Sequence, residues 1–411
     1  MQGSVYSYRL KSGARRWGYV YDLPATGKAT RRVQQRKQGF PTERAAARAL
    51  REQLAQLDAG IVVERSSVTL AQYLLDEWLP TKQPTTQAGA GRRSRGRLGI
   101  ATWQQYHDYI RAYIAPHLGA VKLQDLTPAM VERAYTELEL RGGKRQQGLS
   151  PATLANAHGI LHKAMADAVR WSKVPRNVMD LVDAPRADKP DTAVWDIAQL
   201  RAFLGYVEDD PYYALWLLYA TTGLRRGEAL GLRWPDLNLD LELAHVRQTL
   251  GSLHGNPVWK PRPKSEASAR SLALDPMTVG ALRTYRAQQN QWRLSAGPDW
   301  DAAPVDHLGV AKTDTVFTWE DGRLINPERI SKWFEEHRRT AGLPKIRLHD
   351  VRHSYATAAL RQATGWHEVK TLSRRLGHAS VGMTLDTYSH ALPADDRAQA
   401  NTLAALLLNE S

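Results

Sequence analysis

Residues 222–232 read TGLRRGEALGL, and this stretch places Arg225 directly after a glycine turn. A second stretch, LHDVRHSYATAAL at 348–360, carries apolar residues at helical spacing. Residues three apart lie on the same face of a helix, so His349 and Arg352 are expected to lie side by side. Both stretches therefore predict helices that present arginine and histidine on one face.

Two further stretches carry reactive side chains. KPRPKSEASARSLAL at 260–274 is strand-like and predicts a hairpin that contains Lys264. In LSRRLGHASVGMTLDTYSHAL, at 372–392, His378 follows a glycine and Tyr388 comes ten residues later.

These residue types suit the transfer of a phosphodiester. Two guanidinium groups can clamp one phosphate, because their planar forks match its oxygens and stay charged. A tyrosine hydroxyl can attack phosphorus if a base takes its proton, and histidine carries protons near neutral pH. A lysine can protonate the departing oxygen. Cationic side chains then supply the charge, so we expect no metal and no other cofactor.

Taken together, the stretches TGLRRGE, PKSEASAR, HDVRH, LGH and TLDTYSH resemble the catalytic set of the tyrosine recombinase (phage integrase) family. Val351 stands where the family usually has leucine, which is a conservative packing change. The resemblance implies one role for each matched residue: Arg225 and Arg352 hold the scissile phosphate, Lys264 is the leaving-group acid, His349 is a general base or proton relay, His378 bonds the phosphate, and Tyr388 is the nucleophile.

The resemblance implies a site-specific DNA recombinase, an integrase that cleaves and rejoins DNA through a 3′-phosphotyrosine intermediate. Its partners would be double-stranded DNA attachment sites, a homotetramer on DNA, and possible accessory proteins: an excisionase and a host DNA-bending protein. Three alternatives stay open. They are a chromosome-dimer-resolving recombinase, a DNA-binding regulator without catalysis, and a zinc hydrolase built on the HDVRH string, which is similar to a zinc-binding pattern.

Upstream of these motifs, the sequence predicts two further domains. LAQYLLDEWL, TWQQYHDYIRAYIAPHLG, TPAMVERAYTELEL and SPATLANAHGILHKAMADAVRW show helical spacing and predict a helical core-binding domain over 66–186. Thr102, Thr127 and Ser150 are expected N-caps. APRADKPDTA, at 184–193, has the composition of a linker. The catalytic domain is expected over 187–411.

The first segment, 1–65, is short-stranded, aromatic and basic. VYSYRL, RRWGYVYDL and RRVQQRKQGF predict three antiparallel strands, followed by a helix that Thr42 caps. The segment contains 13 Lys and Arg against 5 Asp and Glu. A basic sheet with interleaved aromatic side chains suits a DNA groove, so we expect an arm-type DNA-binding domain. The predicted fold class is thus mainly α with small β elements, in several domains: a three-stranded sheet plus helix, a helical domain, and an α-rich catalytic domain with a small antiparallel sheet.

Composition agrees with a polyanionic partner. The chain of 411 residues has a formal net charge of +14, which favours nucleic acid because phosphate contacts release counterions. It contains no cysteine, which excludes disulfides and thiolate nucleophiles. We see no signal peptide and no apolar run of membrane-spanning length, so we expect no membrane partner and a cytoplasmic location.

Four features have an undecided or structural interpretation. Glu228 is expected to order the helix that follows Arg225 rather than to react, and His353 to pack against its own helix. Arg270 either contacts phosphate or faces solvent. The Leu-rich run at 395–408 is expected to form an amphipathic helix, donated to a neighbouring protomer or folded back on its own core.

Overall fold

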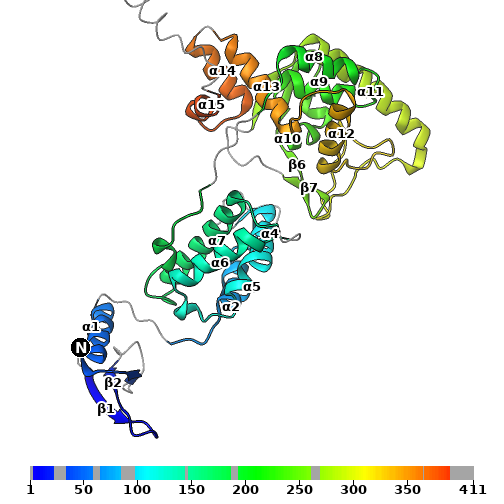
Figure 1. The fold of residues 1–411 in the computed structure, drawn as a ribbon. Coiled ribbons are helices and arrows are strands. Elements are labelled where there is room, and N and C mark those ends of the chain that lie inside the picture. The colour runs from blue at the N-terminus through cyan, green and yellow to red at the C-terminus, as the bar shows by residue number, and fades with distance from the viewer. Residues whose placement is uncertain are drawn as a thin grey trace, which may run out of the picture. The chain divides into compact units, whose positions relative to one another are not determined.

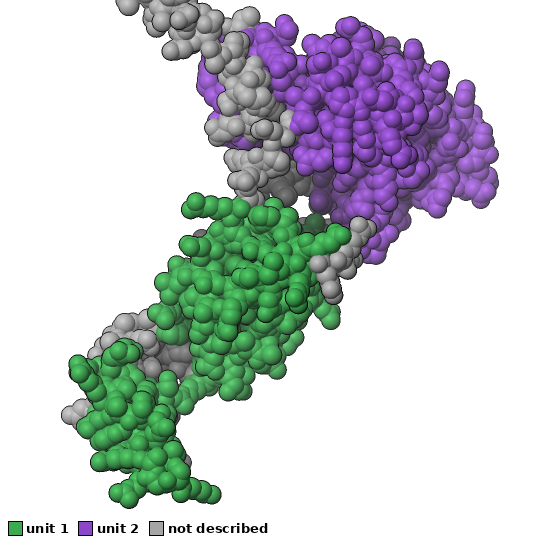
Figure 2. Space-filling view, in the orientation of Figure 1, with its two compact units in different colours: residues 1–189 green, residues 190–411 purple. Residues whose placement is uncertain are grey.

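A computed structural model describes residues 3–22, 34–58, 65–84, 98–143, 147–186, 193–260, 269–363 and 365–388. The chain divides into two compact units, Met1–Lys189 and Pro190–Ser411 (Figures 1 and 2). Both are rich in helices, and the strands form small antiparallel sheets. The predicted fold class is therefore confirmed. The Leu-rich run at 395–408 lies entirely outside the described residues.

The first unit begins with the predicted three-stranded sheet and its helix. The elements are β1 (Gly3–Arg9), β2 (Arg15–Asp22), β3 (Gln34–Phe40) and α1 (Glu43–Asp58). Both strand pairs are antiparallel, with β2 in the centre. Tyr19 and Tyr21 of β2 are buried with Leu50 of α1, because alternate residues of a strand point to one face. The hydroxyl of Thr42 accepts the N–H of Ala45 at 3.2 Å, as expected of a cap.

The remainder of this unit is helical. Its elements are α2 (Leu70–Gln72), a π-helical turn (Tyr73–Trp78), α3 (Leu79–Thr81), α4 (Ile100–Tyr109), a second π-helical turn (Ile110–Ile114), α5 (Ala115–Leu118), α6 (Pro128–Arg141) and α7 (Pro151–Arg170). Thr127 and Ser150 cap α6 and α7 as predicted. The prediction for Thr102 is wrong. Gly99 is the N-cap instead, because its carbonyl accepts the N–H of Trp103 at 2.9 Å and so adds the residues before Thr102 to the helix.

In the second unit, a group of short strands lies between two groups of helices along the chain. Its elements are α8 (Ile197–Tyr206), α9 (Tyr213–Thr222), α10 (Arg226–Leu230), β4 (Leu237–Asn238), β5 (Leu243–Val246), β6 (Thr249–Leu253), β7 (Asn256–Lys260), β8 (Arg270–Ala273), α11 (Pro276–Ala296), α12 (Pro327–Thr340), α13 (Leu348–Arg361), α14 (Trp366–Leu376) and α15 (Val381–Tyr388). Asn326 caps α12 through the N–H of Glu328, with Pro327 at the first position, as the sequence predicts.

The strands around 261–268 do not form the predicted hairpin with each other. β7 pairs with β6, whereas β8 pairs with β5 in a second sheet of order β4-β5-β8. The pairing of β8 with β5 places Leu272 opposite Ala244, and both side chains are buried. Burial of this apolar pair accounts for the choice of partner, because register is set by the hydrophobic face of a strand. Lys264 itself lies outside the described residues.

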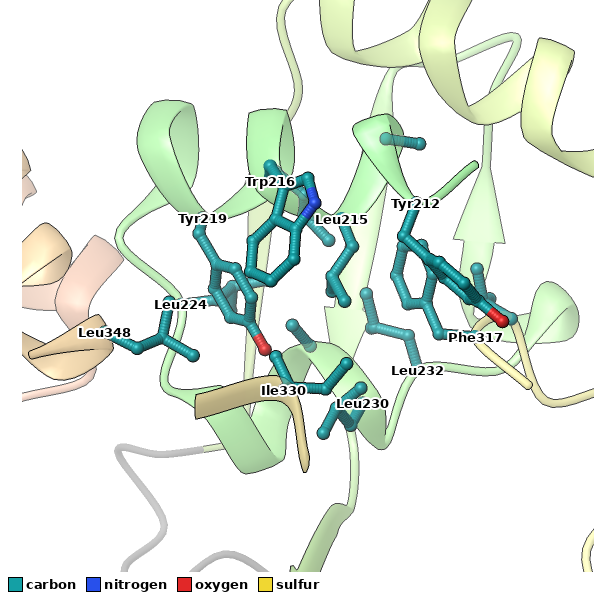
Figure 3. Close-up of a cluster of buried hydrophobic side chains, with 14 of the residues drawn as sticks. Tyr212, Leu215, Trp216, Tyr219, Leu224, Leu230, Leu232, Phe317, Ile330 and Leu348 are labelled. Atoms are coloured by element: carbon teal, nitrogen blue, oxygen red, sulfur yellow. The ribbon is translucent and has the colours of Figure 1, made fainter. Parts of the chain in front are cut away.

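The core of the second unit holds the residues that flank the predicted site. Trp216 and Tyr219 of α9 pack with Phe317 and Ile330 in one cluster of buried side chains (Figure 3). Leu224 and Leu348 belong to the same cluster and immediately precede Arg225 and His349 in the chain. Each such buried side chain contributes roughly 1.5–3 kcal/mol relative to exposure, so the backbone on both sides of the site is firmly anchored.

A second cluster joins α13, α14 and α15. Ala356 and Leu360 of α13 are buried with Val369, Leu372 and Leu376 of α14. This packing fixes the C-terminal end of α14 against the helix that carries His349 and Arg352 (Figure 1). Among the described residues, no helix combines the length and the apolar character needed to cross a bilayer.

Candidate active site

Arg225 stands at the start of a short helix whose first turn is organised by an acid. Gly223, with a φ of +64°, is the C-cap of α9. Arg225 is the N-cap of α10, and its backbone N–H donates to the Glu228 carboxylate at 2.9 Å. Its guanidinium also donates to that carboxylate, at 2.8 Å. Glu228 thus orders the start of this helix, as the sequence interpretation expected.

The guanidinium groups of Arg225 and Arg352 converge on the C-terminal end of α14. Arg352 is only 3% exposed; its Nη1 donates to the carbonyl of Gly223 and its Nη2 to that of Leu376, both at 2.7 Å. Arg225 reaches the same Leu376 carbonyl at 3.5 Å and that of Gly377 at 3.4 Å. Two arginines far apart in the sequence therefore share one backbone carbonyl, that of Leu376.

His378 lies in the turn that follows α14. The helix ends at Gly377, with a φ of +67°, and the N–H of His378 closes the turn onto the carbonyl of Ser373 at 3.1 Å. Its Nδ1 lies 2.7 Å from the hydroxyl of Thr384 in α15. Burial lowers the pKa of His378 to about 4, and the charges of Arg352 and Arg225 add to this effect. The ring is thus neutral at pH 7 and close to both arginines.

His349 lies at the start of α13, on the same helix as Arg352. The residue keeps contact with solvent, yet the surrounding protein partly dehydrates its ring. The pKa of His349 is lowered to about 4, and this dehydration is the largest cause. The charges of the neighbouring His353 and Arg352 lower the pKa further. The rings of His349 and His353 meet edge to face at a centroid distance of 5.0 Å. His349 is consequently a neutral imidazole at pH 7 and can accept a proton.

The sequence left two alternatives open for Arg270, contact with phosphate or exposure to solvent, and the structure contradicts the second. Its side chain is only 7% exposed and forms an ion pair with Glu228 at 2.9 Å. Its Nε donates to the carbonyl of Arg375 at 2.6 Å. The sequence carried no signal for this burial, because Arg270 meets residues 42 and 105 positions away.

Arg226 follows Arg225 in the chain but faces a different element. Its Nη1 donates to the hydroxyl of Ser331 in α12 at 2.6 Å. Arg225, and not Arg226, therefore shares backbone partners with Arg352.

Two predicted residues cannot be placed beside this cluster. Lys264 lies outside the described residues. Tyr388 is the last residue of α15, and its side chain lies outside what the structure describes. The structure therefore brings together Arg225, Arg352 and His378, and it places His349 on the same helix as Arg352.

The zinc alternative finds no support in the part of the chain that the structure describes, where no three His, Asp or Glu side chains are grouped to hold a metal ion. In the HDVRH string, Asp350 accepts the backbone N–H of Arg347 at 2.7 Å and its guanidinium at 2.8 and 2.9 Å. The carboxylate thus serves as a helix cap and an ion-pair partner.

Two family models match the chain, one in each of its two units. The model of the phage integrase family matches residues 196–395, a range that contains all the arginines and histidines described above. The chain belongs to the phage integrase family of tyrosine recombinases. A second model, the N-terminal SAM-like domain of phage integrases, matches residues 92–138.

Curated relatives of this recombinase carry the same family names. It is 25% identical to a XerC-like tyrosine recombinase of Caldanaerobacter subterraneus, covering 75% of this chain and 78% of the relative. It is 26% identical to the putative prophage phiRv2 integrase of Mycobacterium tuberculosis, covering 81% and 83%. Membership of this family makes the protein an enzyme that cleaves and rejoins DNA.

Solved structures share its fold. The Tn1549 transposon integrase in complex with a circular intermediate DNA has a TM-score of 0.65 at 20% identity, covering 82% of this chain and all of that one. A lambda integrase tetramer bound to a Holliday junction has a TM-score of 0.51 at 17% identity, covering 91% and 95%.

The pKa values of the two histidines predict the pH dependence of DNA cleavage. At DNA concentrations well below saturation, the rate reports ionisations of the free protein. Since the pKa values of His349 and His378 are lowered to about 4, both rings stay neutral until the pH falls towards that value. We expect the rate to stay level on the acid side of neutrality and to fall only as the pH approaches about 4, where His349 can no longer accept a proton. Single-turnover cleavage measured across this range checks the prediction, and a midpoint near 6.5, the ordinary value, would contradict it.

Proposed function

We propose that Arg225 and Arg352 bind the two non-bridging oxygens of a scissile phosphate at the C-terminal end of α14. The observation that carries this proposal is their shared alignment on the carbonyl of Leu376, at 3.5 and 2.7 Å, next to the turn that holds His378. A phosphodiester gains charge on those oxygens in its five-coordinate transition state. Preorganised cations at that position are worth several kcal/mol, about 10²–10³ in rate for one donor.

In this mechanism Tyr388 is the nucleophile. Its phenol oxygen attacks the phosphorus and forms a 3′-phosphotyrosine bond, while the bond to the 5′ oxygen breaks. His349 accepts the phenol proton, directly or by relay, and Lys264 gives a proton to the departing 5′ oxygen. His378 donates a hydrogen bond to the phosphate. In the reverse step a 5′ hydroxyl attacks the phosphotyrosine and rejoins the strand, so the bond energy is kept and no ATP is needed.

We propose that the substrate is a pair of attachment sites and that the product is an integrated or excised mobile element. The similarity to integrases of a prophage and of a transposon supports this choice. Strand exchange would proceed in pairs through a Holliday junction in a homotetramer, the assembly named for the lambda structure. An excisionase and a host DNA-bending protein are further proposed partners, and the cytoplasm is the proposed location.

Three domains would share this work: an arm-type DNA-binding domain (1–65), a core-binding domain (66–186) and the catalytic domain (187–411). The sheet of the first domain has an open face that supports its role. Tyr6 and Gln38 lie on either side of Gly18 in register, and the Gln38 amide donates to the Tyr6 hydroxyl at 3.0 Å. Arg16 and Arg36 lie on the same face by strand alternation. Such a face combines charge with groups able to hydrogen-bond base edges.

Deletion of residues 1–65 tests whether the first domain has a role separate from DNA cleavage. We expect the truncated protein to cleave a core site at a rate within about threefold of the full chain, because the residues that contact the phosphate all lie beyond position 220. Integration between two attachment sites should fall by more than about tenfold, because the charge that contacts the arm sites is lost. The two activities are measured side by side on linear DNA.

The same deletion separates the second candidate function, a chromosome-dimer-resolving recombinase. The similarity to a XerC-like recombinase favours that candidate. Integration that is unchanged after the deletion would support it, because a resolving enzyme would need no arm sites.

A further inference from the structure

The buried carboxylate of Glu228 is shared by two arginines. Glu228 is only 2% exposed, and its Oε1 accepts from Arg225 at 2.8 Å and from Arg270 at 3.1 Å. Its Oε2 accepts from Arg270 at 2.9 Å and from the backbone N–H of Arg225 at 2.9 Å. Arg270 therefore binds the carboxylate in bidentate fashion, which fixes its plane as well as its position. The orientation of this plane decides where the Arg225 guanidinium points.

Arg270 also connects β8 to the turn at the end of α14. Its Nε donates to the carbonyl of Arg375 at 2.6 Å. Its guanidinium packs against the backbone of Gly377, where an added Cβ would lie 2.7 Å from Nη1 and 3.0 Å from the guanidinium carbon. A side chain at position 377 would collide with Arg270, in addition to the strain that a φ of +67° imposes. One residue thus contacts both the partner of Arg225 and the turn that carries His378.

We infer that Arg270 is a positioning residue for phosphate binding, which acts mainly through Glu228 on Arg225 and to a smaller extent through the end of α14 on the turn before His378. This inference rests on the proposed roles of Arg225 and His378. The guanidinium of Arg270 binds the Glu228 carboxylate, and its Nε donates to the carbonyl of Arg375. Through these two contacts Arg270 supports the residues that are proposed to bind the phosphate. It also begins β8, six residues after Lys264, and so anchors the strand that follows the proposed leaving-group acid.

Loss of Arg270 should impair chemistry more than DNA binding. Without it, Arg225 is the one charged side-chain partner that the buried Glu228 carboxylate keeps among the described residues, and the guanidinium of Arg225 is drawn towards it. A displacement of about 1 Å in a catalytic group can cost about 10² in rate. The charge on the DNA-facing surface changes little, because the Arg270 side chain is 7% exposed.

The experiment compares Arg270→Met and Arg270→Lys with wild type on a nicked suicide substrate. At saturating DNA we expect Arg270→Met to form the covalent complex about 10²-fold more slowly. Arg270→Lys should be intermediate, about tenfold slower, because lysine keeps the charge and loses the bidentate geometry. The Kd from gel shift should stay within about threefold of wild type for both.

Arg338→Met is the matched control. Arg338 is also a buried arginine in the second unit, 9% exposed, and it likewise binds one carboxylate, of Glu335, and one backbone carbonyl, of Leu343. Its replacement removes a comparable set of bonds away from the site. We expect a lower Tm for this variant and a cleavage rate at saturating DNA within about twofold of wild type.

A double variant separates positioning from a general structural role. If Arg270 acts mainly through Arg225, then Arg225→Met together with Arg270→Met should cleave within about threefold of Arg225→Met alone. Losses that multiply would overturn the inference, as would an Arg270→Met variant that cleaves at the wild-type rate or loses affinity and not rate. If Arg270→Met does not fold, Arg270→Lys in the same two backgrounds decides. A wild-type protein that forms no covalent complex would instead contradict the proposed function.

Discussion

Replacement of Tyr388 by phenylalanine should abolish covalent protein–DNA adducts and leave the Kd for attachment-site DNA within about threefold of wild type. The variant loses one oxygen atom, which is the atom that forms the bond to phosphorus in the proposed mechanism. The proposed phosphate contacts of Arg225 and Arg352 are unchanged in this variant, so we expect affinity to be kept. A suicide substrate nicked near the cleavage site traps the adduct, which is separated from free protein on a denaturing gel.

Tyr206→Phe is the control for this experiment. Tyr206 lies at the end of α8, 45% exposed, and its loss of a hydroxyl should not change adduct formation. Adducts that persist in Tyr388→Phe would show that the nucleophile is a different residue. If the wild-type protein binds the DNA and forms no adduct, the protein is a regulator without catalysis.

Arg225→Ala should cost far more in rate than in affinity. In the proposed mechanism the guanidinium stabilises the additional charge that the phosphate gains in the transition state, so its loss should slow cleavage at saturating DNA by about 10²–10³. The Kd should rise by less than about tenfold, because many other phosphate contacts contribute to binding. The two numbers come from single-turnover cleavage and from gel shift.

Arg226→Ala provides the neighbouring comparison, because Arg226 bonds Ser331 and does not share the carbonyl of Leu376. We expect its cleavage rate at saturating DNA within about threefold of wild type. Equal losses of rate and affinity in Arg225→Ala would mean that Arg225 only binds DNA.

The local features of the fold could be predicted from the sequence. Caps such as Thr127, Ser150 and Asn326 bond backbone N–H groups within three residues of themselves, so they can be recognised from the local sequence. The motif spacing also singled out Arg225 and Arg352, and the structure shows that each directly follows or lies near a leucine of one buried cluster, Leu224 and Leu348. Their catalytic roles stay predictions.

Features that depend on distant partners could not be predicted in this way. The hairpin around Lys264 was a wrong prediction because strand pairing is decided by residues far along the chain: β8 pairs with β5. The burial of Arg270 has the same origin. The alignment of both arginines depends on the carbonyl of Leu376, a backbone group that carries no signal in the sequence.

The central claim is that two guanidinium groups and one phenol meet at a single phosphorus. The most direct test is an experimental structure of the Tyr388→Phe variant assembled on attachment-site DNA. We predict that Arg225 and Arg352 each lie within hydrogen-bonding distance of a non-bridging oxygen of the same phosphate. The ring at position 388, from the same or a neighbouring protomer, should face its phosphorus opposite the 5′ oxygen. A phosphate held by both arginines with every ring at 388 far out of reach would contradict the account.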